Sequence, residues 1–285
     1  MRFAKGHGTG NDFVILPDPD GLLDLPADLV AGLCDRHKGL GADGVLRVVR
    51  SAAGGGEVPA GEAAEWFMDY RNADGSVAEM CGNGVRVFAR YLLAEGLADG
   101  PELAIATRAG LRRVRVQDDG QLTVDMGEAH VLGDGRVQLG DQSLTGLAIS
   151  VGNPHLACLT GEPVGNIDLA APRLLSGGNP AGMNVEVLRI TGEHEIEMRV
   201  HERGSGLTMS CGTGAVAAAV AAAVSAGEWL SGRAVPWRVD VPGGRLVVTP
   251  SATASLLTGP AEIVARGELG ASWLAGLSPA RVPIC

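Results

Sequence analysis

The sequence predicts an α+β protein built from two similar halves, and three features lead to that prediction. A cysteine followed by Gly-x-Gly and a helix-forming run occurs twice, at 81–96 and at 211–227. Short strand-like runs bounded by Gly, Pro, Asn or Asp precede both repeats. The second repeat continues as a run of Ala and Val that is apolar all round. Each half is therefore expected to wrap strands around one central helix, unless the repeat is the chance similarity that any α/β chain can show.

The regular elements follow the same plan in the two halves. Runs of alternating apolar and polar residues, or short apolar blocks, predict strands. Runs with helical periodicity that end in glycine predict helices, because glycine readily adopts the left-handed conformation that follows a helix end. Strands are expected at 12–16, 45–49, 65–70, 103–107, 111–116, 121–126, 146–151, 156–159, 185–191, 194–201, 236–241 and 245–249, and helices at 27–36, 82–95 and 212–226.

Two domains are expected from the repeat and from the length of 285 residues, which allows each half its own core. Residues 1–124 would form the first domain and residues 125–285 the second, with a last strand near 260–268 returning to the first. In the first central helix Arg86 and Arg90 interrupt the apolar residues, which predicts an edge open to solvent or to a partner. The second central helix is expected to be fully buried.

Composition limits the function classes. The formal net charge of −10 argues against a nucleic-acid-binding surface, which is basic. The start of the chain lacks the apolar core of a secretory signal, and the uncharged run 204–227 has too short an apolar part to cross a membrane. Five cysteines without an export signal indicate reduced thiols in the cytoplasm. The cysteines are at positions 34, 81, 158, 211 and 285.

Neither a metal nor an organic cofactor is expected. The chain contains no C-x-x-C and no H-E-x-x-H, and its nearest His/Glu cluster, at 193–202, alternates like a half-buried strand. Pyridoxal chemistry requires a lysine for the Schiff base, and Lys5 and Lys38 are the only two lysines.

The two repeated cysteines suggest acid–base chemistry. A thiol at the first turn of a helix meets unpaired backbone N–H groups and the positive end of the helix dipole, which lower its pKa from about 8.5 towards neutrality. The Gly-x-Gly after Cys81 and after Cys211 also lets a ligand approach the backbone. Two opposed thiols suit inversion at a carbon that bears hydrogen, because one removes the proton and the other returns it on the opposite face.

Six motifs in order resemble the diaminopimelate epimerase family, and the resemblance covers roughly residues 1–268. It implies two pseudo-symmetric domains, each a curved mixed or antiparallel sheet around a central helix, with the active site in the interdomain cleft. It also implies cofactor-independent interconversion of LL- and meso-diaminopimelate, in lysine and cell-wall precursor biosynthesis, by a protein that is a homodimer in the family. The motifs are 8-GTGNDFV-14, 39-GLGADG-44, 72-NADGSVAEMCGNGVRVFARYL-92, 152-GNPH-155, 179-NPAGMN-184 and 202-ERGSGLTMSCGTGA-215.

The resemblance assigns roles to individual residues. Cys81 and Cys211 are implied to be the acid and the base, and His155 and Glu202 to tune the two thiols. Arg203 has the planar fork that binds a distal carboxylate, and the amides that begin both helices can hold the carboxylate at the reacting carbon. The implied substrate-binding residues are Asn11, Asn72, Gly82, Asn83, Asn153, Asn184, Glu202, Arg203, Gly212 and Thr213.

Some of these residues also have purely structural interpretations. Asn11 and Asn72 lie in sequences that form turns readily, and a turn residue can still present a ligand group. His155 after proline would, in isolation, be read as a satisfied core histidine; within the motif set the functional interpretation is preferred. Cys34 and Cys158 are expected to be small core residues, and Cys285 an incidental free thiol.

Three other functions are compatible with parts of the pattern. A proline or hydroxyproline racemase shares the fold and also uses two cysteines, but the many polar contacts favour a substrate that is polar at both ends. A thiol–disulfide redox protein would use Cys81 and Cys211 as a redox pair. A binding protein that had lost activity would not be expected to keep both cysteines.

Overall fold

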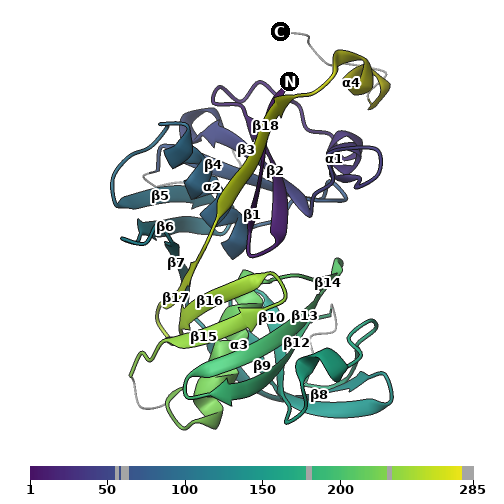
Figure 1. The fold of residues 1–285 in the computed structure, drawn as a ribbon, viewed down its shortest axis with the longest axis vertical. Helices are drawn as coiled ribbons and strands as arrows, with labels where there is room; N and C mark the ends of the chain where they lie inside the picture. Colours follow the sequence, from purple (N-terminus) through teal and green to yellow (C-terminus); the bar gives the residue numbers. More distant parts are fainter. Residues whose placement is uncertain (55–57, 59–63, 178–181, 230–232, 278–285) are drawn as a thin grey trace. The chain divides into compact units, whose positions relative to one another are not determined.

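The computed structural model describes residues 1–54, 58, 64–177, 182–229 and 233–277, and these divide into two compact units (Figure 1). Unit 1 contains residues 1–8, 12–122 and 261–285, and unit 2 contains residues 9–11 and 123–260. Within the described ranges, none of the helices is long and apolar enough to cross a membrane.

Unit 1 is a mixed sheet with one long central helix. Strand β2 pairs in parallel with β3, β3 antiparallel with β4, β4 in parallel with β5, and β5 antiparallel with β6, while β1 pairs with β2 and with β18. The elements are β1 (Arg2–Gly8), β2 (Asn11–Pro17), α1 (Ala27–Cys34), β3 (Gly44–Arg50), a 3-10 turn (Ser51–Ala53), β4 (Trp66–Asn72), α2 (Gly82–Ala94), β5 (Glu102–Thr107), β6 (Gly110–Val116), β18 (Glu262–Glu268) and α4 (Ala271–Leu277).

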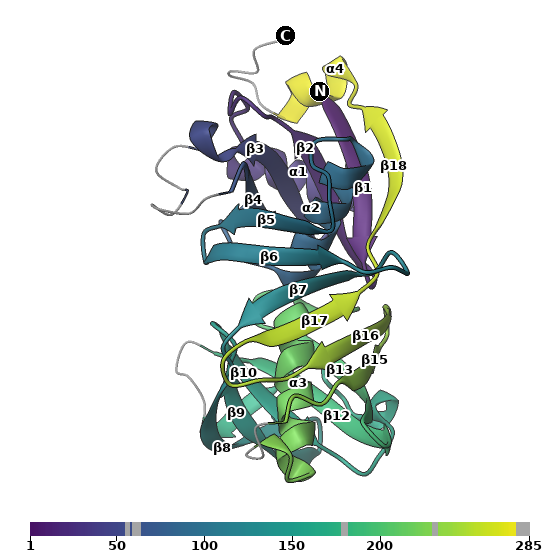
Figure 2. The same ribbon diagram turned by 90° about the vertical axis from the view of Figure 1, so that its left-hand side faces the viewer.

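Unit 2 repeats this arrangement around α3, which Figure 2 shows with strands on several sides of it. Strand β10 pairs in parallel with β12, β12 antiparallel with β13, β13 in parallel with β15, and β15 antiparallel with β16. The elements are β7 (Leu122–Gly127), β8 (His130–Leu139), β9 (Gln142–Ser150), β10 (Pro154–Leu159), a 3-10 turn (Val164–Asn166), β11 (Arg173–Ser176), β12 (Asn184–Gly192), β13 (Glu195–Glu202), β14 (Gly206–Thr208), α3 (Gly212–Ser225), β15 (Trp237–Val241), β16 (Gly244–Thr249) and β17 (Ser255–Gly259).

The two units therefore share one order of strand pairings. In each, a parallel, an antiparallel, a parallel and an antiparallel pair follow one another, and the central helix lies in the chain between the two strands of the third pair. The α+β class predicted from the sequence is confirmed. The common order also supports a duplication, because chance similarity would not reproduce four consecutive pairings.

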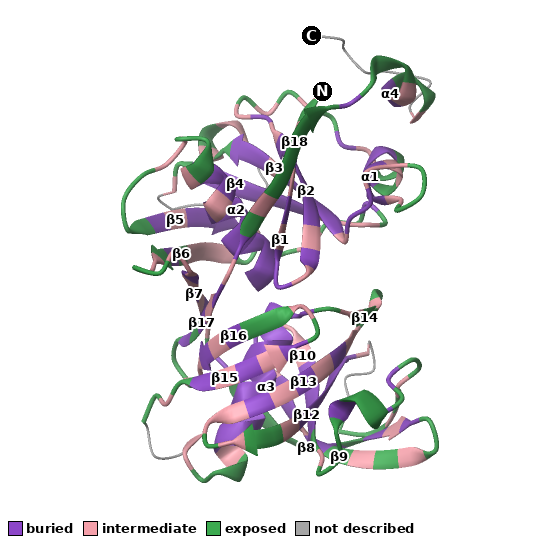
Figure 3. Ribbon diagram, viewed as in Figure 1, coloured by how far each residue is buried: buried purple, intermediate pink, exposed green. Residues whose placement is uncertain are grey.

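The two central helices differ in what they bury. Residues 212–223 of α3 are all buried, as predicted from its apolar sequence, and Figure 3 shows this helix as buried along most of its length. For α2 the prediction of an open edge at Arg86 is wrong, because the Arg86 side chain is completely buried. Backbone and side-chain oxygens at the start of the same helix accept hydrogen bonds from its guanidinium, which makes burial of the charge tolerable.

Several elements had no clear signal in the sequence. Strands β1, β8, β11, β14 and β17 were not predicted, and neither was helix α4, which follows β18. Leu269 and Leu274 belong to a hydrophobic core of unit 1 together with residues of β2, α1 and β3. The C-terminal part of the described chain thus closes the core of the first unit.

Candidate active site

The first predicted thiol caps helix α2. Cys81 has extended backbone angles (φ −143°, ψ 120°), and its Sγ accepts a hydrogen bond from the Gly84 N–H at 3.4 Å. The side chain is half-buried. A sulfur that caps a helix replaces the usual Ser or Asp oxygen and lies at the positive end of the helix dipole. The local geometry predicted for this cysteine is confirmed.

A buried cation accompanies Cys81. Arg86, one turn into α2, donates from Nη2 to Asn83 Oδ1 at 2.9 Å and from Nη1 to the Gly82 carbonyl at 3.4 Å. Burial lowers the pKa of Arg86 to about 10, and the negative charge of the Cys81 thiolate acts to raise it. The guanidinium therefore stays charged at neutral pH, next to the residues that begin the helix.

Two of the predicted asparagines of the first half, Asn72 and Asn11, lie at turns. Asn72 ends β4, and its Nδ2 donates to Ser76 Oγ at 3.0 Å. The Asn72 carbonyl accepts from the Gly75 N–H, which closes the turn. Asn11 is the first residue of β2, follows the left-handed residues Thr9 and Gly10, and is 7% exposed. The turn interpretation is therefore correct for Asn72, and a turn also leads into Asn11.

The second predicted thiol caps α3 in the same way. Cys211 is extended (φ −124°, ψ 121°), and its Sγ accepts from the Gly214 N–H at 3.4 Å and lies 3.5 Å from Thr213 Oγ1. With 5% exposure it is more buried than Cys81. Together with Gly212 and Thr213, which are also buried, it forms the first turn of the helix.

The expectation of a lowered thiol pKa is wrong for Cys211. Burial raises its pKa well above the ordinary value, and the charges of Glu202 and Glu186 raise it further. The hydrogen bonds from Thr213 and from the Gly214 N–H act in the opposite direction but are smaller. A helix start does favour a thiolate, but here the removal of water and two carboxylates outweigh it.

A chain of polar side chains leads from the core of unit 2 to this sulfur. His155 is completely buried, with Nδ1 2.7 Å from Glu186 Oε1 and Nε2 2.9 Å from Asn153 Oδ1. Asn153 donates in turn from Nδ2 to Thr213 Oγ1 at 3.3 Å. His155, Asn153 and Thr213, predicted separately, thus form one hydrogen-bonded set that ends at Cys211.

The remaining predicted residues of unit 2 lie on β12 and at the end of β13. Asn184 is the backbone partner of His155 in the parallel pair of β10 and β12, and its Oδ1 accepts from the Arg203 N–H at 2.8 Å. Glu202 Oε1 accepts from Thr208 Oγ1 at 2.5 Å, and its carboxylate also hydrogen-bonds with Cys211. Burial raises the pKa of Glu202. Part of the motif that contains Asn184, residues 178–181, lies outside the described residues.

Glu186 was not predicted as a site residue. The run 185–191 (VEVLRIT) has the pattern of an ordinary strand with three polar positions, and a glutamate in such a run is normally assigned to the solvent side. The sequence did offer one indication: Glu186 lies two residues after the predicted site residue Asn184, and residues two apart on a strand share a face.

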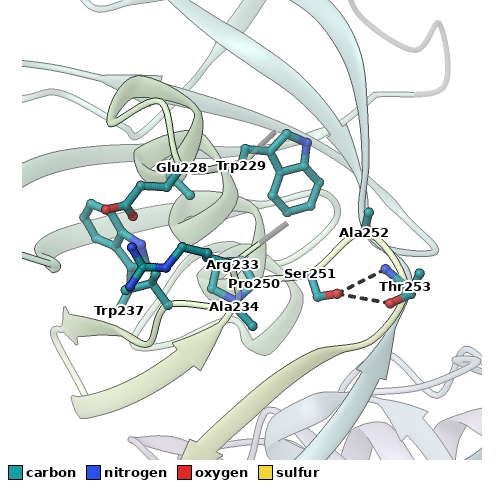
Figure 4. A pocket seen from close by; sticks show the side chains of 11 residues that line it. Glu228, Trp229, Arg233, Ala234, Trp237, Pro250, Ser251, Ala252 and Thr253 are labelled. Carbon is teal, nitrogen blue, oxygen red and sulfur yellow. Dashed lines mark hydrogen bonds between the residues drawn. The ribbon is translucent and has the colours of Figure 1, made fainter. Parts of the chain in front are cut away.

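The other described thiols, and a cavity at the far end of α3, lie away from these two helix starts. Cys34 and Cys158 are buried, as predicted, and burial raises the pKa of each to about 12. Cys285 lies outside the described residues. A cavity of about 210 Å³ is lined by Trp229, Trp237 and nine other residues (Figure 4), including Ala223 near the C-terminal end of α3. None of the predicted site residues lines it.

The two helix starts provide the groups needed for proton transfer at a carbon next to a carboxylate. Each offers a thiol and first-turn backbone amides, and amides at a helix start can stabilise developing negative charge on a carboxylate. The four described cysteines are free thiols. Among the described residues, no group of three or more His, Cys, Asp or Glu is arranged to hold a metal ion.

Comparison with known proteins identifies the family. The family model described as Diaminopimelate epimerase matches residues 3–132 and 147–264. A diaminopimelate epimerase of Thermobifida fusca is 56% identical over 279 residues, covering 96% of this chain and all of the relative, and one of Streptomyces coelicolor is 50% identical over 283 residues, covering 97% and 98%.

Solved structures of lower identity share the fold. A probable proline racemase from Agrobacterium radiobacter, with bound carbonate, aligns with a TM-score of 0.69 at 15% identity and covers 95% of this chain and 93% of its own. A phenazine biosynthesis protein of the PhzF family from Bacillus anthracis aligns with a TM-score of 0.65 at 15% identity, covering 94% and 98%. The sequence matches along nearly the whole chain, and the two helix-capping thiols, place this chain in the diaminopimelate epimerase family.

Proposed function

We propose that this protein is a cofactor-independent epimerase that interconverts LL- and meso-diaminopimelate by two-base proton transfer. Relatives that are 49–56% identical over nearly their whole length carry the name diaminopimelate epimerase. The likeness to the proline racemase structure, at 15% identity, concerns the fold alone. The observation that carries the proposed chemistry is that Cys81 and Cys211 cap two corresponding helices and that each accepts a hydrogen bond from the first turn.

The proposed reaction removes a proton from one face of the α-carbon and returns a proton to the other. One cysteine, as a thiolate, removes the α-hydrogen as a proton, and the electron pair of the C–H bond passes to the α-carbon and its carboxylate. First-turn amides at 82–83 and 212–213 stabilise that charge. The other cysteine, as a thiol, delivers its proton to the opposite face of the carbon. The two cysteines end with their protonation states exchanged, and proton exchange with solvent or the reverse reaction restores them.

The proposed substrate contacts divide the polar groups between the two ends of the molecule. The amides that begin α2 and α3 bind the carboxylate at the reacting carbon, with Asn11, Asn72 and Asn83 as further partners from the N-terminal part of the chain. At the distal amino-acid group, the guanidinium of Arg203 binds the carboxylate, and Glu202 and Asn184 accept from the ammonium. We place this reaction in lysine and cell-wall precursor biosynthesis in the cytoplasm. We also propose that the protein is a homodimer, and sedimentation of the purified protein would test this oligomeric state.

Incubation in heavy water tests the proposed function. Purified protein is given LL-diaminopimelate in one reaction and L-proline in another, and deuterium at the α-carbon is followed by mass spectrometry. We expect deuterium to enter diaminopimelate together with formation of the meso isomer, and proline to remain unlabelled. Deuterium that entered only proline would contradict the proposal and favour a proline racemase.

A further inference from the structure

Glu186 lies at the Cys211 helix start although the proposed mechanism assigns it no role. Its side chain is completely buried on β12, and Oε1 is 2.7 Å from His155 Nδ1. A side-chain carbon at Gly214 would lie 2.7 Å from Glu186 Oε1 and 3.4 Å from Cys211 Sγ. The carboxylate and the sulfur therefore flank the same backbone position of α3.

The second carboxylate oxygen of Glu186 is unusual. Among the residues that the structure describes, Glu186 Oε2 has no hydrogen-bond partner although it is buried. A buried carboxylate is costly unless it is paired, and Glu186 is paired through one oxygen only. A residue kept in such surroundings is expected to have a specific role rather than to add stability.

The contacts of His155 suggest what that role is. Both ring nitrogens are engaged, Nδ1 by Glu186 and Nε2 by Asn153, so the ring has one orientation. A carboxylate that hydrogen-bonds one nitrogen of a histidine fixes the direction in which the other nitrogen points. Through Asn153 and Thr213 this orientation is transmitted to Cys211.

The corresponding position in unit 1 provides an internal contrast. Glu186 is the third residue of β12, and Leu46 is the third residue of β3, the strand that takes the same place in the order of pairings. A side-chain carbon at Gly84 would lie 3.4 Å from Leu46 Cδ2, as one at Gly214 would meet Glu186. The fold therefore accepts a leucine at this position beside a helix-capping cysteine.

We propose that Glu186 is a positioning residue of the Cys211 helix start, which anchors His155 through Nδ1 and places a negative charge beside the Cys211 sulfur. Among the described residues, the charged groups that act on this sulfur are Glu186 on β12 and Glu202 on β13, while His155 on β10 acts on Glu202 and α3 contains no charged residue. The proposal rests on the proposed epimerase function only for its effect on turnover.

Two substitutions separate the anchor from the charge. Glu186→Gln removes the charge but can still hydrogen-bond His155 Nδ1, whereas Glu186→Leu removes both and reproduces the residue found in unit 1. A matched control is Glu197→Leu on the neighbouring strand β13, whose carboxylate is paired with Arg189. Turnover of LL-diaminopimelate is measured for each variant, and the pH dependence of alkylation by iodoacetamide is measured for Cys211 and Cys81 by peptide mass spectrometry.

We expect Glu186→Leu to lower kcat about 10- to 100-fold, the loss known for removal of the carboxylate that orients a metal-bound histidine. Glu186→Gln should keep kcat within about threefold of the wild type, because glutamine can still hydrogen-bond with His155 Nδ1 and hold the ring in place. In both variants the alkylation profile of Cys211 should move to lower pH by about one unit, because a nearby negative charge is lost. The Cys81 profile should not move.

Several results would overturn the proposal. Wild-type turnover in Glu186→Leu would exclude the anchor, and an equal loss in Glu186→Gln would show that charge alone matters. An unmoved Cys211 profile in both variants would exclude the effect of the charge. An equal shift of the Cys81 profile would indicate a general disturbance. Alkylation needs no substrate, so these results are distinct from a failure of the proposed function.

Discussion

The two thiol-capped helix starts have the same backbone design and opposite electrostatic surroundings. Where unit 2 places Asn184 and Glu186 on β12, unit 1 places Gly44 and Leu46 on β3. The backbone partner of Asn184 is His155, whereas that of Gly44 is Phe13. At these three positions, the polar residues of unit 2 are thus replaced by apolar or small residues in unit 1.

The sign of the nearest buried charge also differs. Arg86 lies one turn inside α2, and the equivalent residue of α3, five positions after its cysteine, is Val216. A buried cation accompanies Cys81, whereas Glu186 and Glu202 accompany Cys211. The carboxylates near Cys211 therefore favour its thiol form, whereas the charge buried near Cys81 is a cation; the proposed two-base reaction needs one thiol and one thiolate.

The largest expected effect comes from removing either thiol. Cys81→Ala and Cys211→Ala should each lower kcat for LL-diaminopimelate by about 10³-fold or more, because each removes one of the two proposed proton-transfer groups. Both variants should fold, since neither cysteine is a large core residue. Cys34→Ala, which removes a buried thiol of α1, is the control and should keep turnover within about threefold. Near-normal turnover in either active-site variant would show that the two halves do not share the reaction.

A smaller effect is expected from the cation in unit 1. Arg86→Met should lower kcat about 10- to 100-fold and slow the alkylation of Cys81 at neutral pH, because it removes a buried positive charge beside the thiolate. Arg90→Met on the next turn of α2 is the matched control, because Arg90 donates to the backbone carbonyls of Ala261 and Gly120 rather than at the helix start. If the two substitutions had equal effects on Cys81 alkylation, the assigned role of Arg86 would be wrong.

The third prediction concerns pH. Burial and then the Glu202 and Glu186 charges raise the pKa of Cys211, so removing a carboxylate must lower it. Glu202→Gln should move the alkylation profile of Cys211 to lower pH by about one unit and leave that of Cys81 unchanged. In the wild type, Cys81 should be alkylated faster than Cys211 at pH 7. A shift to higher pH would mean that Glu202 stabilises the thiolate instead.

The helices were predictable because their signals are local. Both central helices begin directly after a cysteine and end near a glycine, and the structure places α2 and α3 within one or two residues of the expected limits. Burial of Arg86 was not predictable, because periodicity assigns a charged residue to the surface. The oxygens that accept its hydrogen bonds become neighbours only when the helix start has formed.

The site residues also divide into those with a local sequence signal and those that only the folded structure reveals. The cysteines, His155 and Asn153 lie in compact motifs that the sequence displays, whereas Glu186 lies in a strand outside these motifs. Its importance depends on a parallel neighbour, β10, and on the close approach of α3 at Gly214. Such contacts between segments distant in the chain leave no local pattern. The raised pKa of Cys211 was missed for the same reason.

Hydrogen exchange in the two single-cysteine variants tests the two-base claim most directly. Cys81→Ala and Cys211→Ala are incubated in heavy water with LL- and with meso-diaminopimelate, and exchange is followed at the α-carbons of each isomer. If each thiol serves one face, the remaining thiol should still exchange the α-hydrogen of one configuration only, with retention, and the two variants should act on opposite configurations. Exchange of the same configuration by both variants, or of both configurations by either, would contradict the account.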